Sequence, residues 1–339
     1  MVVLGAGASY DSSPSHPPPG PNPHISQHRP PLAVELFDNR PEFSAAMQRF
    51  PRCQPIIPYL RNHSTRTVEE ILEGLQSEAM EYPERHRQIA AIRYYLHMML
   101  GAVEERWKET TRDITNHKTL LDQIARWRKR TEQVCLVTFN YDNMLEAALP
   151  VVGMQIHHLK DYVGHDNYKL FKLHGSVDWG RVIGAPTLDP ALNGWTLAEA
   201  VIDNAANLRL TDEFRIAKGY PMPRLGQEML FPAIAIPVQS KTHFECPEGH
   251  LKLLRELIPQ TTKLLMIGWR ATENHFLKLL AEGIQGRTIP VLSVAGGHEE
   301  AQQSVSNLKN AHIVVEPIGF DGGFTDFIVN RVGDDFLKS

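Results

Sequence analysis

Short apolar runs recur along the chain, and most of them end in glycine or in polar residues. They occupy residues 2–4, 134–138, 264–268, 289–294 and 312–315. Helical patterns fill the space between the later runs, at residues 250–258, 274–284 and 298–310. Short buried strands that alternate with helices are typical of a parallel sheet with helices on both faces. The pattern therefore predicts an α/β fold with a Rossmann-like, doubly wound parallel sheet.

Between the first two runs, the apolar residues follow a helical period. Thr67 and Glu70 have the spacing of a capping box, and an apolar stripe starts at Val68. Two more apolar helical stretches lie at 89–107 and 120–130, and their aromatic and methionine content favours a core over a cofactor site. We expect one domain, residues 1–339, with a Rossmann-like core at 1–40 and 131–339 and a helical insert at 41–130. Because the first run is so short, we suspect that the natural chain begins upstream of Met1.

Composition narrows the classes of protein that fit. The 339 residues carry a formal net charge of −4, which argues against nucleic-acid binding. No apolar run approaches the ~20 residues of a membrane span, and no signal peptide is recognisable. Cys53, Cys135 and Cys246 lie too far apart for a disulfide framework or a zinc ribbon, which favours a reducing cytoplasm. His243, Cys246 and His250 lack an obvious fourth ligand, so we expect no metal site.

Proline is concentrated near the start of the chain. Eight of the 24 prolines fall within residues 14–31, a density that predicts neither a helix nor a central strand. A mobile linker and a functional loop both fit this composition. The second interpretation gains support because the segment directly follows the first strand and its glycine-rich turn, where loops often carry function.

That glycine-rich turn is the first candidate for chemistry. In the sequence Gly5-Ala-Gly7-Ala-Ser9, glycine allows a tight turn, and small residues keep backbone N–H groups open to a pyrophosphate. The third glycine of the dinucleotide fingerprint is missing, because Tyr10 stands there. An ordinary dehydrogenase is therefore disfavoured.

Two further segments carry candidate catalytic groups. Asn140 and Asp142 follow the strand at 134–138, where ligands bind in open α/β sheets; Asp142 alone could instead cap the next helix. His174 can act as a general base near neutral pH, and Gly175 would let a ligand approach it closely. With 16 histidines in the chain, a structural role for His174 remains an alternative.

Taken together, these segments resemble the sirtuin superfamily. The matching motifs occur in the same order: GAGAS at 5–9, TFNYD at 138–142, LHG at 173–175 and IGW at 267–269. The chain cannot build the four-cysteine zinc module of sirtuin deacylases, Phe139 replaces a glutamine, and the Pro-rich segment replaces a PDFR-like one. These departures, with IGWRATENHF at 267–276, look like the zinc-less sirtuin-like domains of bacterial antiphage defence proteins, which hydrolyse NAD.

The resemblance implies a role for each matching residue. Asn140 would orient the ribose and the attacking water, Asp142 would support that loop or the ribose hydroxyls, and His174 would act as general base. The remaining matching positions would bind NAD. Those at the pyrophosphate would be Gly5, Ala6, Gly7, Ala8, Ser9 and Asp11. Those at the adenosine half would be Gly268, Trp269 and, more weakly, Glu273, and Thr138 and Phe139 would also contact the ligand. No metal is implied.

The activity that this resemblance implies is an NAD glycohydrolase releasing nicotinamide and ADP-ribose. Unregulated turnover would deplete the host's own NAD, so we expect control by homo-oligomerisation or by a partner protein. We also expect residues 12–31 to close over the nicotinamide end. Two alternatives stay open: an NAD-dependent protein deacylase or ADP-ribosyltransferase, and a non-catalytic module that binds NAD or ADP-ribose. The sequence does not separate NAD from NADP as the ligand.

Overall fold

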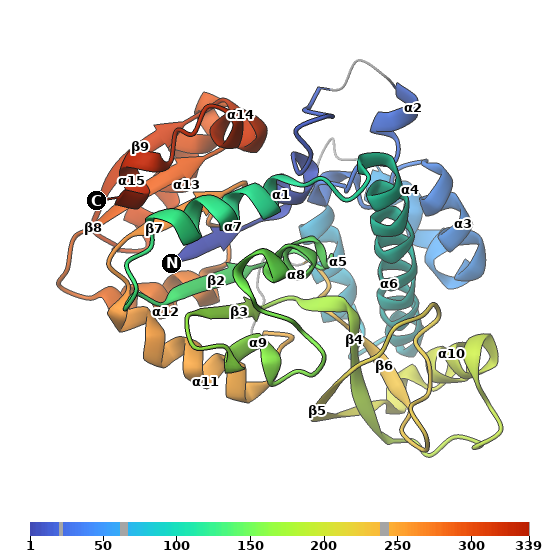
Figure 1. Ribbon diagram of the computed structural model, residues 1–339. Coiled ribbons are helices and arrows are strands. Elements are labelled where there is room, and N and C mark those ends of the chain that lie inside the picture. Colours follow the sequence, from blue (N-terminus) through green and yellow to red (C-terminus); the bar gives the residue numbers. More distant parts are fainter. Residues whose placement is uncertain (20–22, 62–66, 238–243, 339) are drawn as a thin grey trace.

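A six-stranded parallel sheet forms the main layer of the protein (Figure 1). The computed structural model describes residues 1–19, 23–61, 67–237 and 244–338. The strand order is β3-β2-β1-β7-β8-β9. The strands are β1 (Val2–Leu4), β2 (Val134–Thr138), β3 (Tyr168–Lys172), β7 (Leu264–Ile267), β8 (Ile289–Val294) and β9 (Val315–Phe320). The predicted Rossmann-like α/β fold is confirmed.

The central strands are apolar throughout because both of their faces are covered. Every residue of β1, β2 and β7 is buried, which explains the continuous apolar runs at these positions. Leu4 of β1 pairs with Thr138 of β2 and with Ile267 of β7. The carboxyl ends of these three strands therefore lie side by side, and the loops that follow them start from one edge of the sheet.

Helices pack around this sheet. They are α1 (Ala6–Tyr10), α7 (Asn116–Trp127), α8 (Met144–Ala148), α9 (Asp161–Gly164), α11 (Glu248–Leu257), α12 (Asn274–Ile284), α13 (His298–Asn310), α14 (Gly323–Val329) and α15 (Asp334–Lys338). The helices expected at 274–284 and 298–310 have these bounds in the structure. Helix α7 packs against α8, α14 and α15, and its Leu120, Leu121 and Ile124 join the core of the sheet. Although the sequence placed α7 in the insert, it belongs to the sheet layer.

A second hydrophobic core lies beside the sheet (Figure 1). It contains a three-stranded antiparallel sheet of order β5-β4-β6, with β4 (Gly175–Ala185), β5 (Arg209–Ile216) and β6 (Leu230–Ile234). The helices of this part are α2 (Pro23–Ser26), α3 (Pro41–Arg49), α4 (Ile57–Arg61), α5 (Val68–Glu78), α6 (Pro83–Thr111) and α10 (Gly194–Asp203). Short 3-10 turns complete the fold at Ala33–Glu35, Pro51–Ile56, Leu149–Val152, Ala205–Asn207 and Ile258–Gln260.

The long helix α6 is central to this second core. Its Tyr94 stacks on Phe50 of the insert and meets Phe231 of β6 edge to face, which ties the insert helices to the antiparallel sheet. From the sequence, we expected the segment that runs from β4 to β6 to belong to the Rossmann-like core, and we predicted no strands in it. The aromatic residues of the stretch at 89–107 are core residues, as expected, because Tyr94 and Tyr95 are fully buried.

Of two local predictions from the sequence, a helix cap and a short strand, only the first agrees with the structure. The capping box is confirmed: the Glu70 N–H donates to Thr67 Oγ1 (3.2 Å), and the Thr67 N–H donates to Glu70 Oε2 (2.8 Å). The strand expected at 312–315 is wrong, since β9 begins only at Val315. His312 takes a left-handed conformation (φ +62°) after α13, and the buried Ile313 donates back to the carbonyl of Leu308. Its apolar side chain packs at a helix end instead of in a strand.

The Pro-rich segment contains one helical turn that the sequence did not predict. Helix α2 begins at Pro23, a first-turn position where a missing N–H costs no hydrogen bond. No helix in the described ranges is both long and apolar enough to cross a membrane.

Candidate functional site

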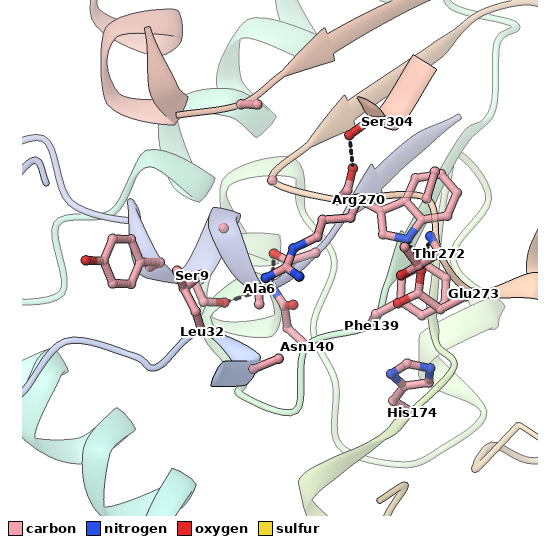
Figure 2. Close-up of a pocket in the computed structure, with 18 of the residues that line it drawn as sticks. Ala6, Ser9, Leu32, Phe139, Asn140, His174, Arg270, Thr272, Glu273 and Ser304 are labelled. Carbon is pink, nitrogen blue, oxygen red and sulfur yellow. Dashed lines mark hydrogen bonds between the residues drawn. The ribbon is translucent and has the colours of Figure 1, made fainter. Parts of the chain in front are cut away.

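The adjoining ends of β1, β2 and β7 open into a cleft of about 1570 Å³ (Figure 2). Its lining comes from the loops after these strands and from helices α5, α6, α12 and α13. Ligand pockets commonly measure ~300–1000 Å³, so this cleft has room for a ligand of dinucleotide size. It lies where the sheet meets the insert, and both parts of the protein contribute side chains to it.

The floor of the cleft is a contact between two backbone turns. The N–H groups of Gly5 and Gly7 donate to the carbonyls of Ile267 (3.0 Å) and Gly268 (3.1 Å). A Cβ on Gly5 would lie 2.5 Å from the Gly268 carbonyl oxygen, and a Cβ on Gly268 would lie 2.5 Å from Gly7 Cα. Gly268 also has φ +58°, a conformation that favours glycine. These glycines therefore permit two loops to pack backbone against backbone.

This packing corrects one expectation about the glycine turn. The sequence suggested that its N–H groups stay open to a pyrophosphate. In the structure, the N–H of Gly5 bonds to the last residue of β7, that of Gly7 bonds to the residue after it, and that of Ala8 bonds to the carbonyl of Gly5 (2.9 Å). The turn lines the cleft through Gly5, Ala6, Gly7 and Ser9, while Ala8 is fully buried and is not among the lining residues.

Asn140 is held by this turn in a defined orientation. Its Nδ2 donates to the carbonyl of Gly5 (2.9 Å) and to Ser9 Oγ (2.8 Å). Both amide protons are thereby used, so Asn140 Oδ1 is the atom of the amide that remains to accept a hydrogen bond from a ligand. The Asn140 backbone N–H donates to Thr138 Oγ1 (3.1 Å). Thr138, expected to bind the ligand, is buried and supports Asn140 instead of lining the cleft.

The hydrogen bonds continue from Ser9 to Asp142. Ser9 Oγ donates to Asp142 Oδ2 (2.6 Å), and the Met144 N–H donates to Asp142 Oδ1 (3.1 Å). Asp142 thus binds the first residue of α8, the capping role that the sequence allowed, and at the same time completes the chain Asn140–Ser9–Asp142. A single carboxylate serves both roles because its two oxygens face different partners.

His174 lies in the cleft within an aromatic wall. Its ring centroid is 4.9 Å from that of Phe139 and 6.2 Å from that of Tyr141. Phe139 in turn stacks on Trp269, with centroids 5.5 Å apart and rings inclined by 14°. Figure 2 shows Phe139 between His174 and the loop that carries Glu273. Phe139, where the sirtuin motif has glutamine, therefore positions the imidazole by packing.

Gly175 does not serve ligand approach, as the sequence had suggested. It has φ +83°, and a Cβ there would overlap the carbonyl oxygen of Ala233 in β6. The glycine is required because β4 starts against β6 at this point. Its neighbour His174 accepts a hydrogen bond from the Ala235 N–H at its own carbonyl (2.9 Å), so the antiparallel sheet holds the backbone of His174 in place.

Asp11 and Glu273 line the cleft but are engaged within the protein. Asp11 accepts hydrogen bonds from the Thr325 N–H (2.9 Å) and Oγ1 (2.6 Å), which ties the N-terminal loop to α14. Burial raises the pKa of Asp11, and the bonds from Thr325 oppose that rise. Glu273 Oε2 accepts from Trp269 Nε1 (2.5 Å) and from the Thr272 N–H (3.2 Å). Glu273 therefore fixes the orientation of the Trp269 indole.

Two buried charged residues that sequence reasoning did not assign hold the loop after β2. Lys172 Nζ bonds to Glu146 Oε1 (2.8 Å) and to the backbone carbonyl of Asp142. Glu104 of α6 accepts from the Asn143 N–H at Oε2 (2.9 Å) and pairs with Lys108 at Oε1 (2.5 Å). A charged residue in the apolar segment around Lys172 was a visible signal. For Glu104 there was none, because its contact with Asn143 spans 39 residues of sequence.

Glu104 carries a perturbed charge. Burial raises its pKa to about 7, and the nearby Asp142 carboxylate adds to the rise, while the Lys108 ammonium opposes it. Glu104 also lines the cleft. Its ionisation thus changes near neutral pH, at the contact between the insert and the loop that carries Asn140.

The described part of the Pro-rich segment is anchored beside the cleft. Arg29 is buried, donates to the carbonyls of Tyr10 (2.7 Å) and His16 (2.9 Å), and lies over the ring of Trp107 in α6. Leu32 and four prolines of the segment line the cleft: Pro18, Pro19, Pro30 and Pro31. The segment therefore forms a wall of the site, and its closure over one end of a ligand stays a prediction.

Within the described ranges, no group of three or more His, Cys, Asp or Glu side chains is placed to hold a metal ion. Of the spaced trio examined in the sequence, His243 lies outside those ranges. Cys246 is buried, and burial raises its pKa to about 12; His250 Nε2 lies 3.0 Å from the carbonyl oxygen of Leu159. No known family model matches the chain, and no curated protein matches it.

Replacing Gly268 with alanine tests the contact between the turns. We expect Gly268→Ala to lower the free energy of unfolding by roughly 3 kcal/mol, because the new Cβ meets backbone atoms in a left-handed residue. Gly286→Ala is the matched control: it has φ +77° but no atom within 4 Å of the added Cβ, and should cost about 1 kcal/mol. Urea unfolding measures both, and equal losses would contradict the contact.

Glu104→Gln tests the charge at the insert. Because the folded pKa is raised from 4.5 to about 7, Glu104 contributes stability below about pH 4.5 that is lost as the pH rises through 7. The difference in unfolding free energy, Glu104→Gln minus wild type, should therefore increase by roughly 3 kcal/mol when the pH is raised from acid to mildly alkaline. The exposed neighbour Glu105→Gln is the control. A difference that does not vary with pH would refute the shift.

Proposed function

We propose that the protein is an NAD glycohydrolase that cleaves the bond between nicotinamide and ribose and releases nicotinamide and ADP-ribose. The observation that supports this most is the meeting of Asn140, Ser9, Asp142 and His174 in one cleft at the ends of β1, β2 and β3. These residues belong to the motifs that resemble the sirtuin superfamily. Neither the fold nor the cleft volume alone would select this reaction.

The chemistry suits the groups present. Cleavage of the N-glycosidic bond develops oxocarbenium-like charge at the anomeric carbon, and nicotinamide leaves as a neutral base that needs no strong acid. Asn140 Oδ1 would accept a hydrogen bond from the attacking water or from a ribose hydroxyl, because both Nδ2 protons are already used. The water adds its oxygen to the anomeric carbon, and His174 would take up its proton. This differs from the paired carboxylates of common glycosidases.

The rest of the cleft would bind the dinucleotide. The turn at Gly5–Ser9 would lie under the diphosphate, and Trp269 would border the adenosine half. Phe139 would keep water from the far side of the imidazole. We further propose that an activity of this kind is held in check by self-association or by a partner protein, as in an antiphage defence effector.

One observation favours a second candidate, a module that binds NAD or ADP-ribose without turnover. The Asn140 amide protons and both Asp142 oxygens are engaged in bonds within the protein, an arrangement that a pure binding site could also use. Protein deacylation ranks lower, because three distant cysteines cannot form the zinc module of sirtuin deacylases.

Turnover of NAD by the purified protein tests the proposal. Wild type should release nicotinamide and ADP-ribose, which chromatography resolves, and Asn140→Ala and His174→Ala should each lower kcat by about 100-fold or more. The exposed positions Asn330→Ala and His158→Ala are matched controls and should keep wild-type rates. Thermal unfolding of each variant shows whether the fold is retained.

The outcomes separate the two candidates. Undiminished turnover in Asn140→Ala and His174→Ala would remove these residues from the reaction. Binding of ADP-ribose by wild type, with NAD left intact across protein concentrations that permit self-association, would favour the binding module. Release of other products would replace the reaction class.

A further inference from the structure

One cationic side chain reaches into the cleft, and nothing described above uses it. Arg270 lies on the loop between β7 and α12 and lines the cleft. Figure 2 shows its side chain extending from that loop across the cleft toward Ala6. The side chain is exposed, and the one hydrogen bond that the described residues give Arg270 is at its backbone carbonyl.

The backbone of this loop is fixed on both sides of Arg270. The carbonyl of Trp269 accepts from Ser304 Oγ (3.0 Å), and the carbonyl of Arg270 accepts from Asn307 Nδ2 (2.8 Å). The next residue, Ala271, has φ +54°, a strained conformation for alanine that persists only where the surroundings determine it. The direction in which Arg270 leaves the backbone is therefore set by α13 and by the glycine contact.

The charge balance of the cleft gives Arg270 a special position. Among the residues that the structure describes, seven carboxylate side chains line the cleft, against two Lys or Arg side chains, Arg270 and Lys278. Among the described residues, no carboxylate forms an ion pair with Arg270, and the nearby Glu273 is bound to Trp269 and Thr272. A guanidinium that pairs with none of the described carboxylates is suited to an anionic group of a ligand.

The glycine turn cannot supply that charge by itself. Three of its N–H groups, those of Gly5, Gly7 and Ala8, are already used in backbone hydrogen bonds. The Asp142 carboxylate also lines the cleft, and both of its oxygens already accept hydrogen bonds within the protein. Arg270 reaches toward the same turn from the loop after β7 and can offer two parallel N–H groups to a phosphate (Figure 2).

We propose that Arg270 binds the diphosphate of the nucleotide ligand and determines the selectivity of the cleft for phosphorylated over unphosphorylated nucleosides. This inference rests on the proposed function for the identity of the dinucleotide, but not for the binding of a phosphate. Lys278 is the fifth residue of the regular helix α12, about one turn beyond the loop, so it serves as a comparison of equal charge.

Binding measurements on four proteins test the inference. Isothermal titration of ADP-ribose with wild type, Arg270→Gln, Arg270→Lys and Lys278→Gln compares equal losses of charge within one cleft. Arg270→Gln should weaken ADP-ribose binding at least tenfold, Arg270→Lys should weaken it less, and Lys278→Gln should stay within about twofold of wild type. Adenosine, which lacks phosphate, should bind wild type and Arg270→Gln with equal affinity.

Several results would overturn it. Equal weakening by Arg270→Gln and Lys278→Gln would mean that only net charge matters, and unaltered binding by Arg270→Gln would mean that the guanidinium plays no part. Failure of wild type to bind ADP-ribose would also refute it. Absence of NAD turnover, with ADP-ribose binding still dependent on Arg270, would refute the proposed reaction and leave this inference standing.

Discussion

The backbone contact between the turn at Gly5–Gly7 and Gly268 is the constraint on which the site depends. It brings the loops after β1 and β7 close enough for direct hydrogen bonds, and the carbonyl of Gly5 then orients the Asn140 amide. The same contact sets the start of the loop that carries Trp269 and Arg270. Side chains from three strand ends therefore take their positions from a contact that is made by backbone atoms.

The loop after β2 is held by groups from both halves of the protein. Lys172 reaches it from the sheet, and Glu104 reaches it from the long insert helix α6. Because both charges are buried, each one is costly unless its partner stays in place. The position of Asn140 thus depends on how the insert packs against the sheet, which offers a route by which events on the insert can reach the cleft.

Two kinds of feature could be predicted from the sequence. The first are strands that are buried on both faces of the sheet, and the second are side chains at the carboxyl ends of neighbouring parallel strands. The strands at 134–138 and 289–294 and the placement of Asn140, Asp142 and His174 in one cleft belong to these two kinds. The antiparallel sheet was missed because its β4 mixes glycine, arginine and apolar residues and is buried by helices from a distant segment. The contacts of Glu104 and the direction of Arg270 arise only from long-range packing, so no local pattern could predict them.

The three glycines also bear on how this protein can change over evolution. Each of them faces backbone atoms of the other turn, so a side chain gained at one position cannot be accommodated by a smaller side chain on its neighbour. Positions 5, 7 and 268 therefore have no compensating partners and must persist as a set, although positions 7 and 268 are 261 apart in the sequence (268 − 7). Any relative that keeps this contact between the two turns is therefore expected to keep glycine at all three positions.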